Sequence, residues 1–169
     1  MKVDSFRFLP RSFRAYYENA EPLPGEDGET WAPVAKRLAE MRIALLTSAG
    51  LYEAGVDPPY DLDRERQEPL WGDPGWRRLT RSALEPGHLG IAHLHINPAD
   101  IASDPGVAFP LSLLERMAGE GVVGHVAEEH VSVMGYQERH LGGWRDQTAP
   151  EIVARLREQQ VDGVVAAPV

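Results

Sequence analysis

Cysteine is absent from the 169 residues of this sequence. Without a thiol, these residues can form no disulfide bond, no thiolate zinc site and no cysteine nucleophile. No apolar run approaches the roughly 18 residues needed to cross a bilayer, and the first residues, Met1 to Ser5, lack the apolar core of a signal peptide. We therefore expect a cytoplasmic protein.

Positive charge is also scarce. The sequence has 17 Lys and Arg against 26 Asp and Glu, which gives a formal net charge of −9. Because phosphate backbones and anionic lipids are bound by clustered basic side chains, this balance argues against nucleic acid or a membrane surface as the main partner. The length suits one ordinary globular domain, and so does the hydrophobic content of 43%.

Several familiar enzyme motifs are missing as well. Ser48 lacks the Gly-x-Ser-x-Gly frame of a nucleophile elbow. The glycines form neither a dinucleotide-binding fingerprint nor a phosphate-binding loop. His125 and His130 stand five residues apart, which is not the spacing of the zinc-protease helix. These classes of enzyme are therefore disfavoured.

The order of the predicted elements is that of an α/β protein. Short apolar runs closed by turns predict buried strands, and apolar residues at helical spacing between capping residues predict helices. The predicted strands are 42–48, 89–93, 121–126 and 161–167, and the predicted helices are 30–41, 110–119 and 148–159. This alternation indicates a mainly parallel sheet with flanking helices, in a Rossmann-like three-layer arrangement.

Two segments do not fit this alternation. Residues 1–29 are aromatic and irregular and end in a Pro/Gly-rich stretch, so we interpret them as an N-terminal arm to a single domain over residues 30–169. Residues 52–78 are rich in Pro, Asp and Glu and show no periodic element. A loop of this length is usually functional or disordered, and Trp71 and Trp76 favour an ordered one.

Polar and titratable residues follow each predicted strand. In open parallel sheets, ligands bind outside the carboxyl ends of the strands. We therefore predict a site at that edge of the sheet. The segments expected there are Thr47-Ser48-Ala49-Gly50, His93-Leu94-His95-Ile96-Asn97, Glu128-Glu129-His130 and Pro168-Val169.

His93 and His95 alternate around Leu94, so in an extended segment their side chains project to the same face. Together they can bind an anion, a proton or a metal ion. Alternatively, their ring nitrogens only satisfy backbone groups at the end of a strand. A metal ion needs at least a third ligand. The candidates for it are His125, His130, Glu128, Glu129 and Asp73.

The turn Gly72-Asp73-Pro74-Gly75-Trp76-Arg77 pairs an acid with a base. Arg77 can hold a substrate carboxylate by bidentate hydrogen bonds, with Asp73 beside it. The alternative is an ordinary surface turn with a weak ion pair. Ser48, before Ala49-Gly50, can offer its hydroxyl group to an anion.

Several of these motifs together resemble the selenoprotein B subunits of glycine, betaine, sarcosine and D-proline reductases, with the D-proline reductase subunit closest in size and order. The resemblance runs from about Arg42 to the end, roughly three quarters of the chain. It rests on the order and spacing of the motifs. Besides those quoted above, they are Asp104 to Leu111, Gly121 to Gly124, His130, Met134-Gly135 and Val161 to Val169.

The resemblance implies an oxidoreductase subunit for reductive C–N bond cleavage of an amino acid or amine-like substrate. In the family, the strand similar to 164–169 leads into a catalytic selenocysteine, or a cysteine in its place, and the substrate is activated as a Schiff base on a pyruvoyl group of a partner subunit. On this interpretation His93, His95 and His130 are candidates for proton transfer or selenolate stabilisation. The candidates for substrate contact are Ser48, Asp73 and Arg77.

These residues include no such nucleophile. We therefore expect them to be the front part of a longer protein, cut at a selenocysteine codon or by proteolysis. Such a piece would lack the last strand-helix units of the domain and would be inactive alone. We also expect an exposed apolar sheet edge and a homo- or hetero-oligomer with a partner reductase subunit. Two alternatives remain. One is a metal-dependent hydrolase that uses the histidine pair and an acid; the other is a non-catalytic binding or assembly protein that docks through Phe6, Phe8, Tyr16 and Tyr17.

Overall fold

The computed structural model of the chain describes residue 14 and residues 32–68, 71–137 and 142–169. The chain divides into two compact units, Met1–Pro33 and Val34–Val169. The aromatic arm that we predict, with its boundary after residue 29, lies outside the described residues apart from Arg14.

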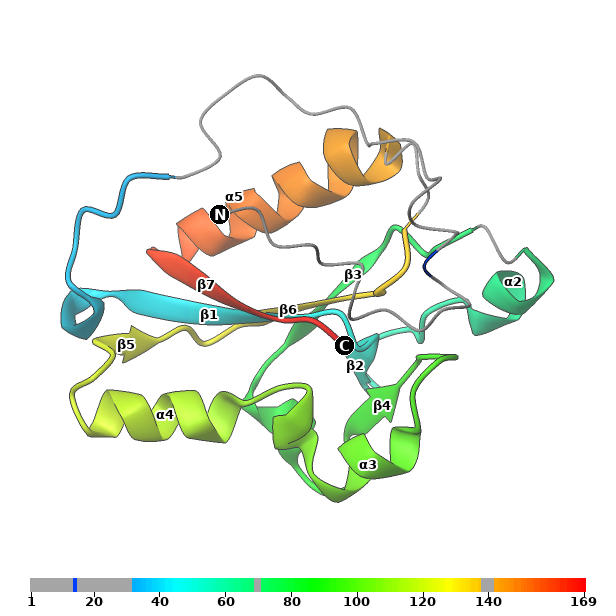
Figure 1. Cartoon of the computed structure of the whole chain (residues 1–169), viewed down its shortest axis with the longest axis horizontal. Helices are drawn as coiled ribbons and strands as arrows, with labels where there is room; N and C mark the ends of the chain where they lie inside the picture. Colours follow the sequence, from blue (N-terminus) through cyan, green and yellow to red (C-terminus); the bar gives the residue numbers. More distant parts are fainter. Residues whose placement is uncertain (1–13, 15–31, 69–70, 138–141) are drawn as a thin grey trace. The chain divides into compact units, whose positions relative to one another are not determined.

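The second unit is an α/β structure built on a mixed, mostly parallel sheet (Figure 1). β1 is central: β5 and β6 pair with it in parallel along one side and β7 along the other, while β3 pairs antiparallel with β6. This confirms the predicted class and the mainly parallel sheet. The strands are β1 (Arg42–Thr47), β3 (Trp76–Leu79), β5 (His125–Val126), β6 (His130–Val133) and β7 (Gly163–Ala167).

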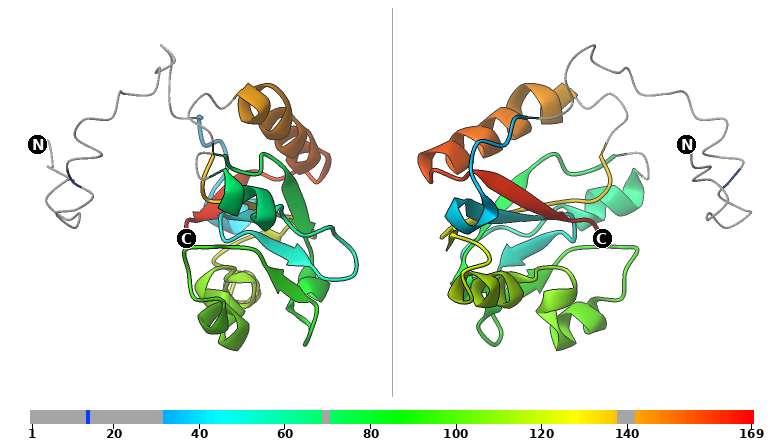
Figure 2. Two further views of the ribbon diagram at one scale, coloured as in Figure 1. Left: turned by 90° about the vertical axis from the view of Figure 1, so that its right-hand side faces the viewer. Right: turned by 60° about the vertical axis from the view of Figure 1, so that its left-hand side comes forward.

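Helices lie on both faces of this sheet: α5 (Ala149–Glu158) on one and α4 (Leu111–Gly119) on the other (Figures 1 and 2). Side chains alternate along a strand, so β1 supplies apolar groups to both faces, whereas β6 supplies its two valines to the α5 face. One cluster joins Ile43 and Leu45 to α4, and another joins Val131 and Val133 to Ile152 of α5. Among the described helices, none combines the length and apolar character required to cross a bilayer.

β7 forms an edge of the sheet within the described part of the chain. Its only described strand partner is β1, and Val164 and Val165 are 42% and 47% exposed. An apolar groove runs between this edge and α4, and Leu38, Leu113 and Val165 lie in its lining. The exposed apolar edge that we expected is therefore present at β7.

Two of the predicted helices form as expected. α4 starts after Pro110, and α5 has Pro150 in its first turn, where a missing N–H costs no helical hydrogen bond. A π-helical turn, Trp144–Thr148 (η5), leads into α5.

The helix predicted over 30–41 is wrong in its described part. From residue 32 onward these residues are exposed up to Glu40 and hold only a 3₁₀ turn, Leu38–Glu40 (η2). Pro33 disfavours helical backbone at the residue before it, and β-branched Val34 lowers helix propensity further. Apolar spacing alone was therefore a misleading signal here.

The strand predicted over 121–126 needs correction. Only its last two residues form a strand, β5, and a second strand, β6, begins at His130. Glu128 and Glu129 thus connect two short strands on one side of β1, and the chain leaves the sheet at Met134-Gly135. His130 is therefore the first residue of β6 and does not follow the carboxyl end of a strand. The prediction was wrong because polar residues between two short strands resemble, in sequence, the polar residues that follow a strand.

The strand predicted over 89–93 forms in part but lies elsewhere. β4 (Leu89–Ile91) pairs antiparallel with β2 (Leu51–Glu53) in a separate two-stranded sheet. Residues 52–78 are also more regular than predicted, since they contain α2 (Leu62–Gln67) and β3. These elements are too short to show a period. The other short helices are η3 (Arg81–Leu84), α3 (Pro98–Ser103) and η4 (Pro105–Val107).

Candidate functional site at the carboxyl ends of β1 and β7

The residues that follow β1 and β7 are hydrogen-bonded to each other. Ser48 Oγ accepts a hydrogen bond from the Val169 backbone N–H at 2.9 Å and lies 3.4 Å from the Val169 carbonyl oxygen, to which it donates. The Ser48 N–H donates to the Ala167 carbonyl at 3.3 Å. Parallel pairing places Thr47 level with Ala167, so the two strands end together. The structure thus brings two of the predicted strand exits to one place.

Gly50 brings the exit of β4 to the same place. Its φ of +61° is in the left-handed region, and its carbonyl accepts a hydrogen bond from Ala92 N–H at 2.9 Å. A Cβ atom on Gly50 would lie 2.0 Å from the Ala92 carbonyl oxygen and 2.7 Å from Met134 Sδ. Only glycine permits this approach. Ala92 is followed directly by His93, which therefore reaches the main sheet although β4 belongs to another one.

His93 lies between His95 and the end of β7. Its Nδ1 accepts a hydrogen bond from the His95 backbone N–H at 3.1 Å. A Cβ on Gly135 would lie 3.3 Å from the Val169 carbonyl oxygen and 3.5 Å from His93 Nε2, so these atoms surround one point. Burial lowers the pKa of His93, the charge of His95 lowers it further, and a backbone hydrogen bond with Val169 opposes both. A neutral imidazole is therefore favoured beside the end of β7.

The two histidines are neighbours, but not in the way that the sequence predicts. Residues 94–96 form a bend, not an extended segment. The His93 and His95 rings meet edge to face, with centroids 6.1 Å apart and planes at 85°. The structure brings the pair together, and it also shows one ring nitrogen of His93 satisfying a backbone N–H.

His130 lies in the core. It is 2% exposed, and its ring packs edge to face on Phe109 with centroids 5.3 Å apart. Its Nδ1 accepts a hydrogen bond from Leu45 N–H at 3.0 Å, at the break between β5 and β6 where a strand would otherwise supply the acceptor. Burial lowers the pKa of His130 to about 4. The structure does not bring His130 together with His93 and His95.

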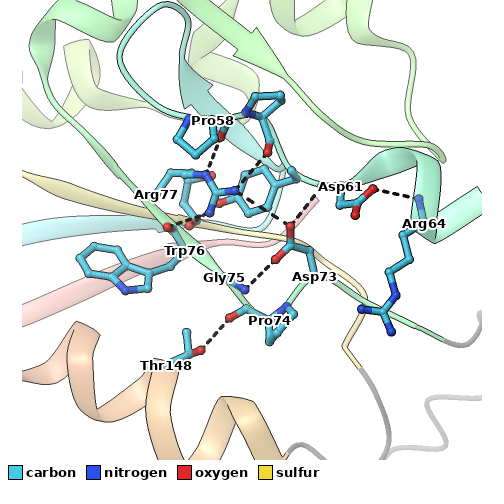
Figure 3. Close-up of polar contacts among 12 residues, drawn as sticks. Pro58, Asp61, Arg64, Asp73, Pro74, Gly75, Trp76, Arg77 and Thr148 are labelled. Carbon is cyan, nitrogen blue, oxygen red and sulfur yellow. Dashed lines mark hydrogen bonds and ion pairs between the residues drawn. The ribbon is translucent and has the colours of Figure 1, made fainter.

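Arg77 and Asp73 form a largely buried clamp (Figure 3). Arg77 Nε donates to the Pro58 carbonyl at 2.7 Å and Nη2 donates to the Pro59 carbonyl at 3.2 Å. The guanidinium carbon lies 4.2 Å from the centroid of the Tyr60 ring, and Nη2 lies 4.0 Å from Asp73 Oδ2. The guanidinium group is thus directed at the protein's own backbone.

Asp73 holds backbone groups in the same clamp. Its Oδ1 accepts from Gly75 N–H at 2.8 Å and its Oδ2 accepts from Asp61 N–H at 3.1 Å (Figure 3). Thr148 Oγ1 donates to the Pro74 carbonyl at 2.6 Å, which ties the turn to the start of α5. These contacts give the turn a structural role, and substrate contact by Asp73 or Arg77 stays a prediction.

We expect Arg77→Lys to lower the free energy of unfolding by about 2 kcal/mol, because an ammonium group cannot replace a planar guanidinium group that donates to three backbone carbonyls and stacks on a ring. Arg78→Lys is the matched control. Arg78 is half-exposed and donates one hydrogen bond to Glu129, so its replacement should cost under about 0.5 kcal/mol. Urea unfolding measures both. Equal losses in the two variants would contradict the clamp.

The proposed metal ligands are not gathered around the histidine pair. Over the described ranges, no group of three His, Cys, Asp or Glu side chains is arranged to hold a metal ion. Glu129 accepts hydrogen bonds from Arg155 Nε at 2.6 Å and Nη2 at 2.7 Å. The arrangement thus gives the metal-dependent hydrolase no support.

Two residues of this region were not among the predicted site residues. Gly135 belongs to the Met134-Gly135 motif of the family resemblance, but nothing in the sequence shows that its backbone lies against His93 and Val169. Glu65 of α2 is 7% exposed, and the charge of His95 acts on its carboxyl group. No pattern distinguishes Glu65 from the other acids of residues 52–78, because its burial depends on a helix too short to predict.

Comparison with known proteins extends this description. The profile of the glycine/sarcosine/betaine reductase selenoprotein B family matches residues 11–168. D-proline reductase subunit gamma of Acetoanaerobium sticklandii is 27% identical over 140 residues, which cover 80% of this chain and 51% of the relative. The chain therefore spans about half the length of the curated relative that it matches. No solved structure matches it.

Proposed function

The chain belongs to the glycine/sarcosine/betaine reductase selenoprotein B family, and we propose that it works as a reductase subunit in the reductive C–N bond cleavage of an amino acid or amine-like substrate. The curated relative is by name a subunit of D-proline reductase. We therefore propose a hetero-oligomer in which a partner subunit completes the site.

With a substrate nitrogen that is not quaternary, the proposed reaction consumes two electrons and two protons; a quaternary nitrogen leaves after the uptake of one proton. The C–N bond breaks, the carbon gains a hydrogen, and a nitrogen that is not quaternary leaves as an amine with a further hydrogen. A selenol–thiol or dithiol pair supplies the two electrons and becomes a selenide–sulfide or a disulfide. When present, a selenol supplies a strong nucleophile that is largely ionised at neutral pH.

One observation within this chain carries the proposal: Ser48, His93 and Val169 meet at the carboxyl ends of β1 and β7. In the family, the nucleophile directly follows the strand that corresponds to β7. A residue joined to Val169 would start beside the Ser48 hydroxyl group and the His93 ring, so the residues present fit a nucleophile at that position.

The roles of these residues follow from their contacts. Ser48 holds the end of β7 through both backbone groups of Val169. His93, kept neutral by burial, can accept a proton from a selenol or thiol and return it to the leaving nitrogen. Gly135 leaves space beside Val169 and His93, because a Cβ atom at this position would contact both residues.

The test is an assay of the protein isolated with its partner subunits from its source cells. We expect release of an amine from an amino acid or amine when a dithiol is the electron donor. His93→Asn should lower kcat by about 100-fold, as the loss of a proton-transfer group does. His88→Asn, an exposed control near Glu85, should not change it.

Absence of C–N cleavage with glycine, sarcosine, betaine and D-proline, and with other amines, would overturn the proposed function. Unchanged kcat in His93→Asn, with cleavage intact, would remove His93 from the mechanism. Mass spectrometry of the isolated subunit tests whether a selenocysteine or a cysteine follows Val169.

A further inference from the structure

A polar cavity lies beside the break between β5 and β6. It has a volume of about 470 Å³, and residues of η3, of α4 and of the connection from β5 to β6 line it. This size is within the range of small-molecule sites. The charged and titratable residues of its lining are Arg81, Glu115, Glu128, Glu129 and His130.

His130 offers a hydrogen-bond donor to this cavity. Its Nδ1 accepts the Leu45 N–H, and burial lowers the pKa of the ring to about 4. At neutral pH the ring is therefore neutral, and its single proton is on Nε2. The hydrogen bond from Leu45 and the packing on Phe109 are the contacts of this ring within the described ranges, so the Nε2–H has no acceptor there.

The unpaired Nε2–H needs an acceptor from outside the chain. His130 is almost fully buried, yet its Nε2 is not among the completely buried unpaired atoms of the described side chains. The small exposed part of the ring therefore borders the cavity that His130 lines. A buried donor without an acceptor is unfavourable, and an acceptor atom of a ligand in the cavity would satisfy it.

Arg81 contributes a positive charge at the same cavity. Its Nη1 donates to Glu115 and to Ser112 Oγ, the latter at 3.3 Å. Its Nε and Nη2 make no hydrogen bond to the part of the chain that the structure describes. The edge formed by Nε and Nη2 has the geometry that binds a carboxylate through two parallel hydrogen bonds.

Glu128 contributes a negative charge. Glu129 pairs with Arg155 at 2.6 Å and with Arg78 at 3.0 Å, and Glu115 pairs with Arg81. Glu128 is exposed and has no hydrogen bond or ion pair with the residues described. Its carboxylate is therefore available to an ammonium group.

We propose that this cavity binds a small zwitterion, a free amino acid or a molecule of the same kind. His130 Nε2–H and Arg81 bind its carboxylate, and Glu128 binds its ammonium group. A simple anion would meet the unpaired Glu128 carboxylate, and a simple cation would leave the donors of His130 and Arg81 without an acceptor.

This site is distinct from the one at the end of β7, since neither Ser48, His93 nor Val169 lines the cavity. The inference therefore goes beyond the proposed function and does not depend on it.

The test is long-range ¹H–¹⁵N NMR of the histidine rings in the 169-residue chain at neutral pH. We expect His130 as the Nε2–H tautomer, and a saturable shift of its Nε2 signal when glycine is added. Acetate and methylammonium, titrated separately, should bind at least about 10-fold more weakly, because each lacks one of the two charged groups.

Two variants test the residues that bind the zwitterion. Glu128→Gln and Arg81→Gln should each weaken glycine binding by at least about 10-fold, because each removes one charged partner. Glu120→Gln is the matched control: it removes the same charge from an exposed acid that does not line the cavity, and it should bind glycine as the wild type does. His93→Asn should also bind glycine normally.

An Nδ1–H tautomer of His130, or no saturable shift with glycine, would overturn the inference. Acetate binding as tight as glycine binding would do so as well, since it would indicate an anion site. Equal weakening in Glu128→Gln and Glu120→Gln would indicate net charge alone, and loss of binding in His93→Asn would place the glycine at the end of β7. If Arg81→Gln does not fold, Arg81→Lys replaces it, because an ammonium group lacks the two-nitrogen edge.

Discussion

Gly50→Ala is expected to lower the free energy of unfolding by at least about 3 kcal/mol, since overpacking and backbone strain act together. The new Cβ atom would lie 2.0 Å from the Ala92 carbonyl oxygen, which is backbone and cannot rotate away. The φ of +61° adds strain for any residue with a side chain. Because Ala92 precedes His93, the same change should displace the His93 ring from Val169.

Gly55→Ala is the matched control for this prediction. Gly55 also has a positive φ, +84°, but nothing lies within 4 Å of a Cβ built on it. This variant therefore reports backbone strain alone, about 1 kcal/mol. Urea unfolding of both variants, with the His93 ring signals followed by NMR, measures the difference. Equal destabilisation would show that the close approach of Gly50 to Ala92 is unimportant.

Lowering the pH from 6.5 to 4 is expected to remove about 3 kcal/mol of stability through His130 alone, at about 1.36 kcal/mol per pH unit. Burial keeps the pKa of folded His130 at about 4, whereas the unfolded chain takes up the proton at about its ordinary value of 6.5. Between these values the unfolded state binds more protons. The stabilisation is therefore complete above pH 6.5 and is lost as the pH falls.

His130→Asn separates this effect from the titration of carboxyl groups. An asparagine oxygen can accept the Leu45 N–H in place of Nδ1, but it takes up no proton in this range. Urea midpoints at pH 7.5, 6 and 5 should fall less steeply in His130→Asn than in the wild type, and the exposed control His88→Asn should keep the wild-type slope. Identical slopes in all three proteins would refute the assignment.

The sequence predicts the long elements of the fold well and the short ones poorly. β1, β7, α4 and α5 were predictable because each combines an apolar pattern with a turn, a proline or a cap at its end. β5 and β6 have two and four residues, and their boundary depends on which part of β1 they pair with. Periodicity cannot indicate a break that only tertiary pairing creates.

The same limit applies to the site. The meeting of Ser48 with Val169 was predictable, because parallel strands end at one edge of a sheet. The environment of His130 was not, since a histidine after two glutamates resembles a strand exit in sequence and becomes a core residue only through Leu45. Likewise the clamp of Arg77 depends on the carbonyl groups of Pro58 and Pro59, which carry no side-chain signal.

The outward edge of β7 has a consequence for how the protein can associate with another polypeptide. A row of backbone N–H and C=O groups beside two exposed valines is a template for strand addition. A polypeptide segment that pairs there would run alongside β7 toward Ser48 and shield the apolar groove at the same time. The sheet edge, the groove and the Ser48 hydroxyl group would then be covered by one and the same segment.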